Sequence, residues 1–133
     1  MVQYITKSKL REFAAELPIR EQASLRKSAA ARALAGSTFL SHSSKDEDLV
    51  VGVIRVLEGH GATVYVDEID PQMPPYTNSE TAALLKQRIQ QTRRFVMLTS
   101  ENSKESRWVP WELGIADGYK GVSEIALFPA SEC

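Results

Sequence analysis

Several features are scarce or missing in this sequence. It has one cysteine, Cys133 at the last position, which excludes an internal disulfide framework and a cysteine-rich zinc site. No apolar run approaches the roughly 18–20 residues that cross a bilayer, and the first residues lack the apolar segment of a signal peptide. We therefore expect a cytoplasmic protein without a membrane partner. The net charge of −1 gives no reason to expect nucleic-acid binding.

Glycine-rich nucleotide motifs are also missing. Neither GxGxxG nor GxxxxGK[ST] follows a predicted strand, which disfavours a dinucleotide held by a glycine fingerprint and a P-loop nucleotide. The GxSxG turn of acyl-transfer enzymes is absent as well. The two histidines, His42 and His60, are too few for a zinc site, so we expect no metal. His60 stands between two glycines and is expected to lie in a turn.

The 133 residues are 43% hydrophobic and 25% charged, as in one ordinary domain with a core. Charge is unevenly distributed along the chain. Residues 1–36 contain seven Lys or Arg and three Glu, a net charge of +4, whereas the remaining nine basic and 14 acidic residues give −5. The composition changes at Gly36. We therefore predict a basic helical leader or linker over residues 1–36 and a domain over residues 37–133.

The leader has a helical pattern. Leu10, Phe13, Ala14 and Leu17 form one apolar stripe, and Pro18 interrupts it. A second helix is predicted over residues 21–35, with Gly36 ending it. The favoured interpretation is packing on its own domain or on a symmetry-related copy, and a linker from a larger protein is the main alternative. The three glutamates argue against a transit peptide, and the lack of interleaved aromatic residues gives a nucleic-acid arm no support.

From Ser37 onward, short apolar strands alternate with helices. Strands are predicted over residues 38–41, 62–66, 95–99 and 125–128. Capping boxes at Ser44–Glu47 and Thr77–Glu80 are expected to open two helices, the first ending near Gly59, and a third runs through Trp108 to Ile115. Residues 67–77 and 100–106 are predicted to be polar loops. This alternation predicts an α/β fold, a flavodoxin-like open doubly wound parallel sheet.

In such a sheet, ligands bind beyond the carboxyl ends of the strands. Ser41–Ser44, Asp67–Glu68 and Thr99–Ser100 follow the first three predicted strands. Trp108 and Glu112, four residues apart, share one face of the helix that can lean over this edge. Glu112 is the best candidate for an acid, a base or a charge stabiliser, and the indole offers a flat stacking surface. The alternative is a first-turn glutamate that suits the helix dipole beside a core tryptophan.

Four segments resemble Toll/interleukin-1 receptor (TIR) domains, especially bacterial ones. Residues 39–46 resemble the first box of the family, and residues 64–67 with the following proline-containing loop resemble its second strand and BB loop. Residues 94–100 are similar to the third strand, and residues 106–113 to the Trp-x-x-x-Glu segment of TIR enzymes. The match covers about residues 37–129 and has the family's order and spacing.

The resemblance implies cleavage of NAD at the bond between nicotinamide and ribose. The products would be nicotinamide and either ADP-ribose or a cyclic ADP-ribose isomer, so NAD is a substrate and no cofactor is expected. Glu112 would be the catalytic carboxylate, and Trp108 would line the nicotinamide side. His42, Ser43 and Asp67 would line the rest of the pocket. Ser43 has the alternative of capping a helix, and Asp67 that of satisfying loop backbone.

The chain departs from the family at two places. TIR domains usually have a fifth strand and a last helix, whereas this sequence stops soon after the fourth predicted strand, so we expect both to be missing, which would expose a sheet edge. The loop over residues 68–76 lacks the glycine often present there. In TIR enzymes that loop contributes to contacts between domains, and a neighbouring copy often completes the pocket. We therefore expect homotypic self-association, with the leader as an aid.

Other functions remain open. A non-catalytic TIR interaction module would use the same loop and the helical faces. A receiver-like phosphorelay domain is set aside, because the positions after the first and third strands hold Ser-His-Ser-Ser and Thr-Ser-Glu in place of the required aspartates. An enzyme like the nucleoside deoxyribosyltransferases would use a glutamate nucleophile on a nucleoside without pyrophosphate. For a bacterial TIR enzyme, the resemblance suggests anti-phage defence or a host-directed effector.

Overall fold

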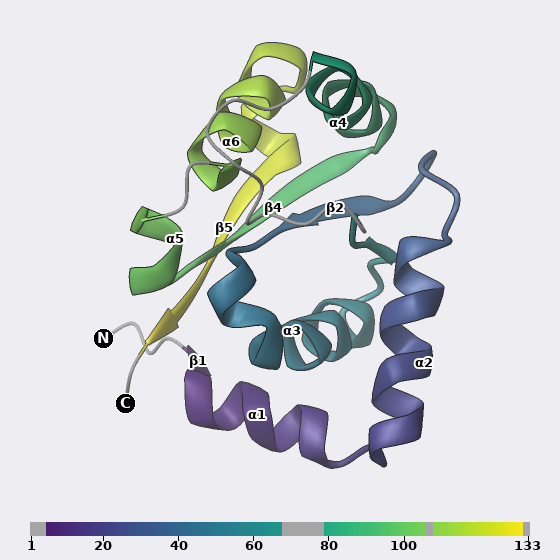
Figure 1. Cartoon of the computed structure of the whole chain (residues 1–133), viewed down its shortest axis with the longest axis vertical. Helices are drawn as coiled ribbons and strands as arrows, with labels where there is room; N and C mark the ends of the chain where they lie inside the picture. Colours follow the sequence, from purple (N-terminus) through teal and green to yellow (C-terminus); the bar gives the residue numbers. More distant parts are fainter. Residues whose placement is uncertain (1–4, 68–78, 106–107, 132–133) are drawn as a thin grey trace.

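A computed structural model describes residues 5–67, 79–105 and 108–131 of the chain. Its centre is a five-stranded sheet in the order β1-β5-β4-β2-β3, and every neighbouring pair is parallel (Figure 1). The strands are β1 (Ile5–Thr6), β2 (Thr38–Ser41), β3 (Val64–Tyr65), β4 (Arg94–Thr99) and β5 (Ile125–Ser131). The predicted α/β class with a parallel sheet is therefore confirmed.

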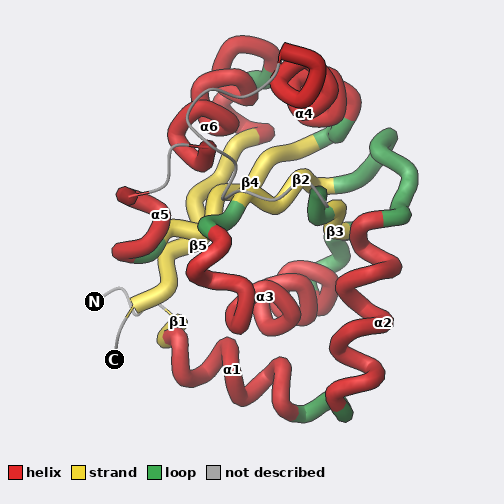
Figure 2. The backbone as a smooth tube through the Cα atoms, viewed as in Figure 1, coloured by secondary structure: helices red, strands yellow, loops and turns green. Residues whose placement is uncertain are grey.

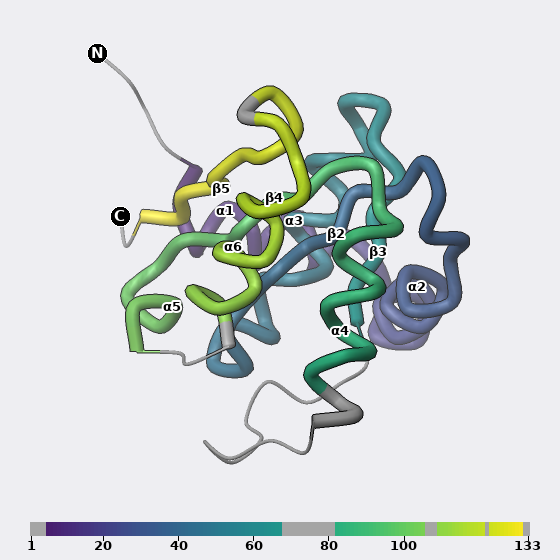
Figure 3. Tube along the Cα trace, turned by 90° about the horizontal axis from the view of Figure 1, so that it is seen from above, coloured from purple at the N-terminus to yellow at the C-terminus, as the bar shows by residue number. Residues whose placement is uncertain are grey.

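Helices cover both faces of the sheet (Figures 1 and 3). One face carries α1 (Lys7–Ala15), α2 (Ile19–Ala30) and α3 (Glu47–Gly59). The opposite face carries α4 (Ser79–Gln91) and α6 (Trp108–Tyr119). A five-residue helix, α5 (Glu101–Glu105), follows β4 directly. Figure 2 shows that these helices account for most of the molecule outside the sheet.

The strands divide their side chains between two cores. On β2, Leu40 packs into the core under α1, α2 and α3, whereas Phe39 packs into the core under α4 and α6. On β4, Val96 and Phe95 divide in the same way. The Phe39 and Phe95 rings stack with their centroids 5.7 Å apart. Because successive side chains of a strand point to opposite faces, a strand buried on both faces is continuously apolar, as these two are.

The leader contributes β1, a strand that the sequence patterns do not predict. Ile5 pairs with Ala130 and Thr6 with Ser131, so β1 extends the sheet beyond β5. Counted from β2, the sheet has the flavodoxin-like order 2-1-3-4, and β1 occupies the fifth position. Among the described residues no strand follows β5, and the position expected to be empty is filled from the other end of the chain. Most of the β5 edge stays open, and Leu127 is 57% exposed.

The leader helices pack on α3. Leu10 of α1 is fully buried, and its backbone lies against Gly52 in the middle of α3. A Cβ atom at Gly52 would lie 2.2 Å from the Leu10 carbonyl oxygen, so only glycine permits this approach. Ala29 of α2 is also fully buried in the same core.

Ion pairs between the leader and α3 account for much of the charge asymmetry. Basic side chains of α1 and of the α2 region face acidic side chains of α3. These pairs are Arg11–Asp48 at 2.5 Å, Arg26–Glu47 and Arg32–Glu58. In a fourth pair, Arg55–Glu16 at 2.8 Å, the basic residue belongs to α3 and the acidic residue to the leader. Arg32–Glu58 is partly buried, and the other pairs are more exposed. Exposed pairs contribute about 0–1 kcal/mol each, so they orient the leader while apolar burial holds it. The boundary predicted at Gly36 stays a prediction about domain organisation.

Some local predictions were wrong. A 3-10 turn (Ser44–Asp46) precedes α3, and Ser43, rather than Ser44, is the N-cap of this turn. The Ser43 hydroxyl accepts a hydrogen bond from the Lys45 amide at 3.2 Å. Glu47 pairs with Arg26 in place of closing a capping box. The second leader helix, α2, ends at Ala30, five residues earlier than predicted. His60 does lie in the turn that ends α3.

Two loop predictions have different outcomes. Part of the predicted loop 100–106 is helical, because the Ser103 hydroxyl accepts from the Ser100 amide and donates to the Ser100 carbonyl, which starts α5. The Thr77 capping position and the loop over residues 68–76 lie outside the described residues.

No helix in the described ranges has the length and apolarity to cross a membrane.

The glycine at the contact between α1 and α3 gives a testable prediction. We expect Gly52→Ala to lower the free energy of unfolding by about 1–3 kcal/mol, because the added methyl forces the two backbones apart. Denaturant titration measures the effect.

Gly59→Ala is the matched control, because nothing lies within 4 Å of its added methyl and it is in the same helix. It should be neutral or stabilising by up to about 1 kcal/mol. Equal losses in the two variants would contradict the role of the contact, because the added methyl at Gly59 meets no neighbour.

Candidate functional site

The candidate site lies where the strand order reverses. The chain passes from β2 to β3 on one side and later to β4 on the other side of β2. In open parallel sheets, the crevice outside the carboxyl ends of such strands is the usual ligand position. Ser41 ends β2 and Thr99 ends β4, and Asp67 follows β3 by two residues. Ser41, Asp67 and Thr99 therefore lie along one edge of the sheet.

Glu112 is the central acidic group of this edge. It belongs to α6, is only 7% exposed, and its Oε1 accepts a hydrogen bond from the Ser41 hydroxyl at 3.0 Å. Ser41 is itself buried, and it is the hydrogen-bond partner of Glu112 among the described residues. The bond joins α6 to the end of the central strand, so the carboxyl group has a fixed position.

Burial controls the protonation of Glu112. Loss of hydration raises the pKa of Glu112 from 4.5 to about 8, because a charged carboxylate is disfavoured away from water. The Ser41 hydrogen bond opposes this increase, and the negative charge of Asp67 adds to it. The carboxyl group is therefore mostly protonated at neutral pH. Strongly shifted acids of this kind concentrate at functional sites.

Asp67 is held by two neighbours. Both of its carboxylate oxygens accept from Arg88 Nη1, at 2.9 and 2.8 Å, and Oδ2 also accepts from the Tyr65 hydroxyl at 3.0 Å. Burial, followed by the charge of Asp67, raises the pKa of Tyr65 to about 12. Asp67 is thus tied to β3 and α4, and it influences Glu112 through its charge.

His42 and Ser43 belong to the turn after β2. His42 is buried, and its Nδ1 lies 3.0 Å from the Ser43 carbonyl oxygen, which can only accept, so Nδ1 carries the proton. Burial lowers the pKa of His42, and the ring is neutral near pH 7. Ser43 has the capping role that was its alternative interpretation. Trp108 begins α6, and its side chain lies outside the described part of the structure.

A buried cluster at the same edge was not predicted. Asp46 is almost completely buried, and it accepts hydrogen bonds from the Ser100 hydroxyl at 2.5 Å and from the Asn102 amide at 2.7 Å. These bonds tie the turn after β2 to the turn after β4. The signal was weak, because Asp46 looked like an ordinary acidic residue at a helix start and Ser100 like part of a loop.

The geometry allows two roles for the carboxyl group of Glu112, one for each protonation state. A buried carboxyl group with a pKa near 8 donates a hydrogen bond when protonated, and stabilises an adjacent cation when it has lost its proton. The neutral imidazole of His42 lies in the turn after β2, and the carboxylate of Asp67 is paired with Arg88.

Comparisons with known proteins agree with the fold. The sequence profile of the TIR domain matches residues 38–130. A Bacillus cereus protein named "Probable 3' cyclic ADP-D-ribose synthase ThsB'" is 40% identical over 93 residues, which are 68% of this chain and 47% of that protein. A Cytobacillus dafuensis protein named "Putative cyclic ADP-D-ribose synthase TIR2" is 32% identical over 78 residues, 56% of this chain and 21% of that protein.

The chain thus spans about half the length of the first relative and about a fifth of the second. The profile match includes β2 to β5 and the helices between them, with Ser41, Asp67 and Glu112 inside it. Together with the parallel sheet, it shows that this chain belongs to the TIR domain family.

Proposed function

We propose that this protein is an NAD nucleosidase that cleaves the bond between nicotinamide and ribose. The observation that carries the proposal is the buried carboxyl group of Glu112, fixed by Ser41 at the strand-order reversal. The two relatives named as cyclic ADP-D-ribose synthases support NAD as the substrate class. NAD is consumed in this reaction and is not a resident cofactor.

The chemistry needs a stabiliser of positive charge. The C1′–N bond breaks with both electrons passing to nicotinamide, which leaves as a neutral molecule. The ribose becomes a cationic oxocarbenium ion, and the Glu112 carboxylate stabilises it in a site with little water. Water then attacks C1′ and loses a proton to give ADP-ribose, or a group within the ADP-ribose attacks and loses a proton to give a cyclic isomer.

Ser41 and the cationic substrate have matching effects on Glu112. The free carboxyl group is mostly protonated at pH 7, with the Ser41 hydrogen bond favouring the charged form. The positive charge of bound NAD favours the charged form further.

Trp108, His42, Ser43 and Asp67 are proposed to line the substrate pocket. Self-association is proposed to complete the pocket, and signalling in immunity to be the biological role.

Nicotinamide release from NAD by the purified protein tests the proposal. Glu112→Gln keeps the size of the side chain and removes its charge, so we expect release to fall at least about 100-fold. Glu21→Gln on the exposed side of α2 is the matched control and should leave the rate unchanged.

Rates should be measured over a range of protein concentrations. A rate that rises more steeply than the protein concentration would support activity in the assembled form. No release at any concentration would contradict the proposal and favour a non-catalytic TIR interaction module.

The pH dependence tests which form of Glu112 is active. If the carboxylate stabilises the oxocarbenium ion, kcat/KM rises about tenfold per pH unit below about 8 and becomes constant above it. In Ser41→Ala the midpoint should move to higher pH, because a hydrogen bond to the charged form is lost. A kcat/KM that falls with pH over this range would assign Glu112 the role of an acid.

Stability gives an independent test of the buried carboxyl group. The folded chain binds a proton at Glu112 that the unfolded chain releases above its ordinary pKa of 4.5, so wild-type stability falls as pH rises from about 4.5 to 8. Glu112→Gln removes this dependence. We expect the variant to gain stability relative to wild type across this range, up to roughly 5 kcal/mol, measured by denaturant titration. Parallel curves for the two proteins would contradict burial of a titrating carboxyl group.

A further inference from the structure

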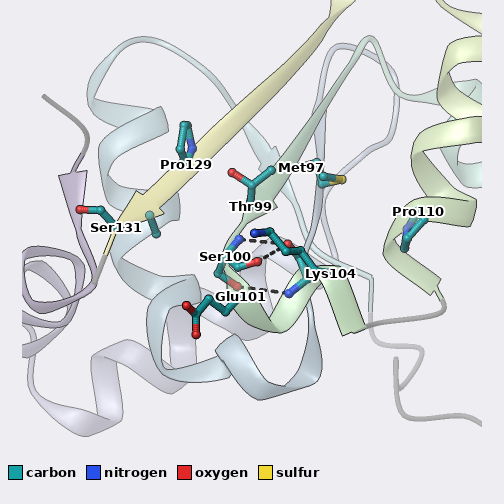
Figure 4. A pocket seen from close by; sticks show the side chains of 10 residues that line it. Met97, Thr99, Ser100, Glu101, Lys104, Pro110, Pro129 and Ser131 are labelled. Carbon is teal, nitrogen blue, oxygen red and sulfur yellow. Dashed lines mark hydrogen bonds between the residues drawn. The ribbon is translucent and has the colours of Figure 1, made fainter. Parts of the chain in front are cut away.

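A cavity of about 550 Å³ lies beside α6, beyond the ends of β4 and β5 (Figure 4). Cavities that bind small organic ligands typically have about 300–1,000 Å³, so this one has the size for a nucleotide. It occupies the edge of the sheet where parallel α/β folds bind ligands. Glu112 does not line it; Pro110, two residues earlier on α6, does.

The cavity is one side chain away from the Glu112 site. The strand register places Met97 of β4 beside Ser41 of β2, and Met97 lines the cavity. Met97 packs in the core under α4 and α6, and Ser41 bonds to Glu112 of α6, so both side chains lie on that face of the sheet. The cavity therefore adjoins the Glu112 site, with Met97 between the two.

The lining combines apolar walls with a few polar groups. Met97, Pro110 and Pro129 supply apolar surface, while Thr99, Glu101 and Lys104 supply a hydroxyl, a carboxylate and an ammonium group. Within the part of the chain that the structure describes, none of these three side chains has a hydrogen-bond or ion-pair partner. In Figure 4, Thr99, Ser100 and Lys104 gather at the end of β4.

These groups match the parts of a nucleotide diphosphate. A lysine ammonium attracts phosphate as a point charge, and a carboxylate accepts hydrogen bonds from ribose hydroxyls, as in dinucleotide sites. The apolar walls can enclose a purine ring. A phosphate alone would leave the walls empty, and a purely apolar ligand would leave the lysine and the carboxylate unused.

We propose that this cavity binds the adenosine diphosphate part of NAD while Glu112 acts on the nicotinamide riboside part. The proposal rests on the proposed function for the identity of the substrate, but nucleotide binding in the cavity can be measured without turnover. Lys104 interacts with a phosphate, and Met97 separates the two parts of the site.

Titration calorimetry of the full chain with ADP is the first experiment. Lys104→Glu should weaken ADP binding at least tenfold, because attraction for phosphate becomes repulsion. Lys27→Glu on α2 makes the same charge change on the other side of the molecule and should change the affinity less than twofold. Pyrophosphate and adenosine, each lacking one part of the ligand, should both bind more weakly than ADP.

A second variant tests the cavity by its shape. Thr99→Phe fills the space without a change of charge and should also weaken ADP binding at least tenfold, with thermal unfolding used to confirm that the chain is folded. The proposal would be overturned if the wild-type chain did not bind ADP, or if both cavity variants bound ADP as tightly as the wild type. Either result would count whatever is found with NAD.

The kinetics of NAD cleavage then show whether the cavity binds part of the substrate or a separate nucleotide. ADP should raise KM for NAD without lowering kcat, and Lys104→Glu should raise KM several-fold. If ADP lowers kcat and leaves KM unchanged, the cavity is a separate regulatory site and the substrate assignment is overturned. Lys104-dependent ADP binding in a chain that cleaves no NAD would support the nucleotide site and contradict the proposed function.

Discussion

A parallel sheet must be covered on both faces, and here one covering layer depends on the contact between α1 and α3 at Gly52. The absence of a side chain there lets the Leu10 backbone reach α3. Leu10 then fills the core together with Val50, Val53 and Ile54 of α3. The ion pairs around this contact match charge to charge, but each contributes little in exposed positions. The close approach of the two helices is what brings β1 to the edge of β5.

The opposite face of the sheet differs, because it holds a carboxyl group whose charged form is disfavoured by burial. Glu112 is enclosed between α6 and β2, and one hydroxyl, that of Ser41, is its hydrogen-bond partner among the described residues. A glutamine would satisfy the same bond without the cost of ionisation. The chain thus gives up stability at neutral and alkaline pH to keep an ionisable group at this position, a compromise typical of functional sites. The Asp46 cluster and the Asp67–Arg88 pair stabilise the neighbouring turns.

Much of the fold could be predicted from the sequence, because fully apolar strands and amphipathic helices have distinct periods. Strands β2 to β5 and the turn at His60 followed from these patterns, and Glu112 followed from its spacing to Trp108. Contacts between distant segments could not be predicted. The two-residue strand β1 has no period to detect, and neither Gly52 nor Ser41 differs in sequence from an ordinary helix glycine or a strand-end serine. The N-cap was misplaced by one residue because Ser43 and Ser44 are equally good capping residues.

The position of β1 has a consequence for how the chain folds. Among the described residues, β1 pairs with a strand that is distant in sequence, since Ile5 meets Ala130. The layer of α1, α2 and α3 can assemble early from segments close in sequence, whereas the sheet edge waits until β5 has been made. Closing so long a loop is entropically costly and raises the mean sequence separation of contacts, which slows folding. Until that closure, the end of β5 at Ala130 and Ser131 is also available to other molecules, so rapid docking of β1 protects this part of the edge against aggregation.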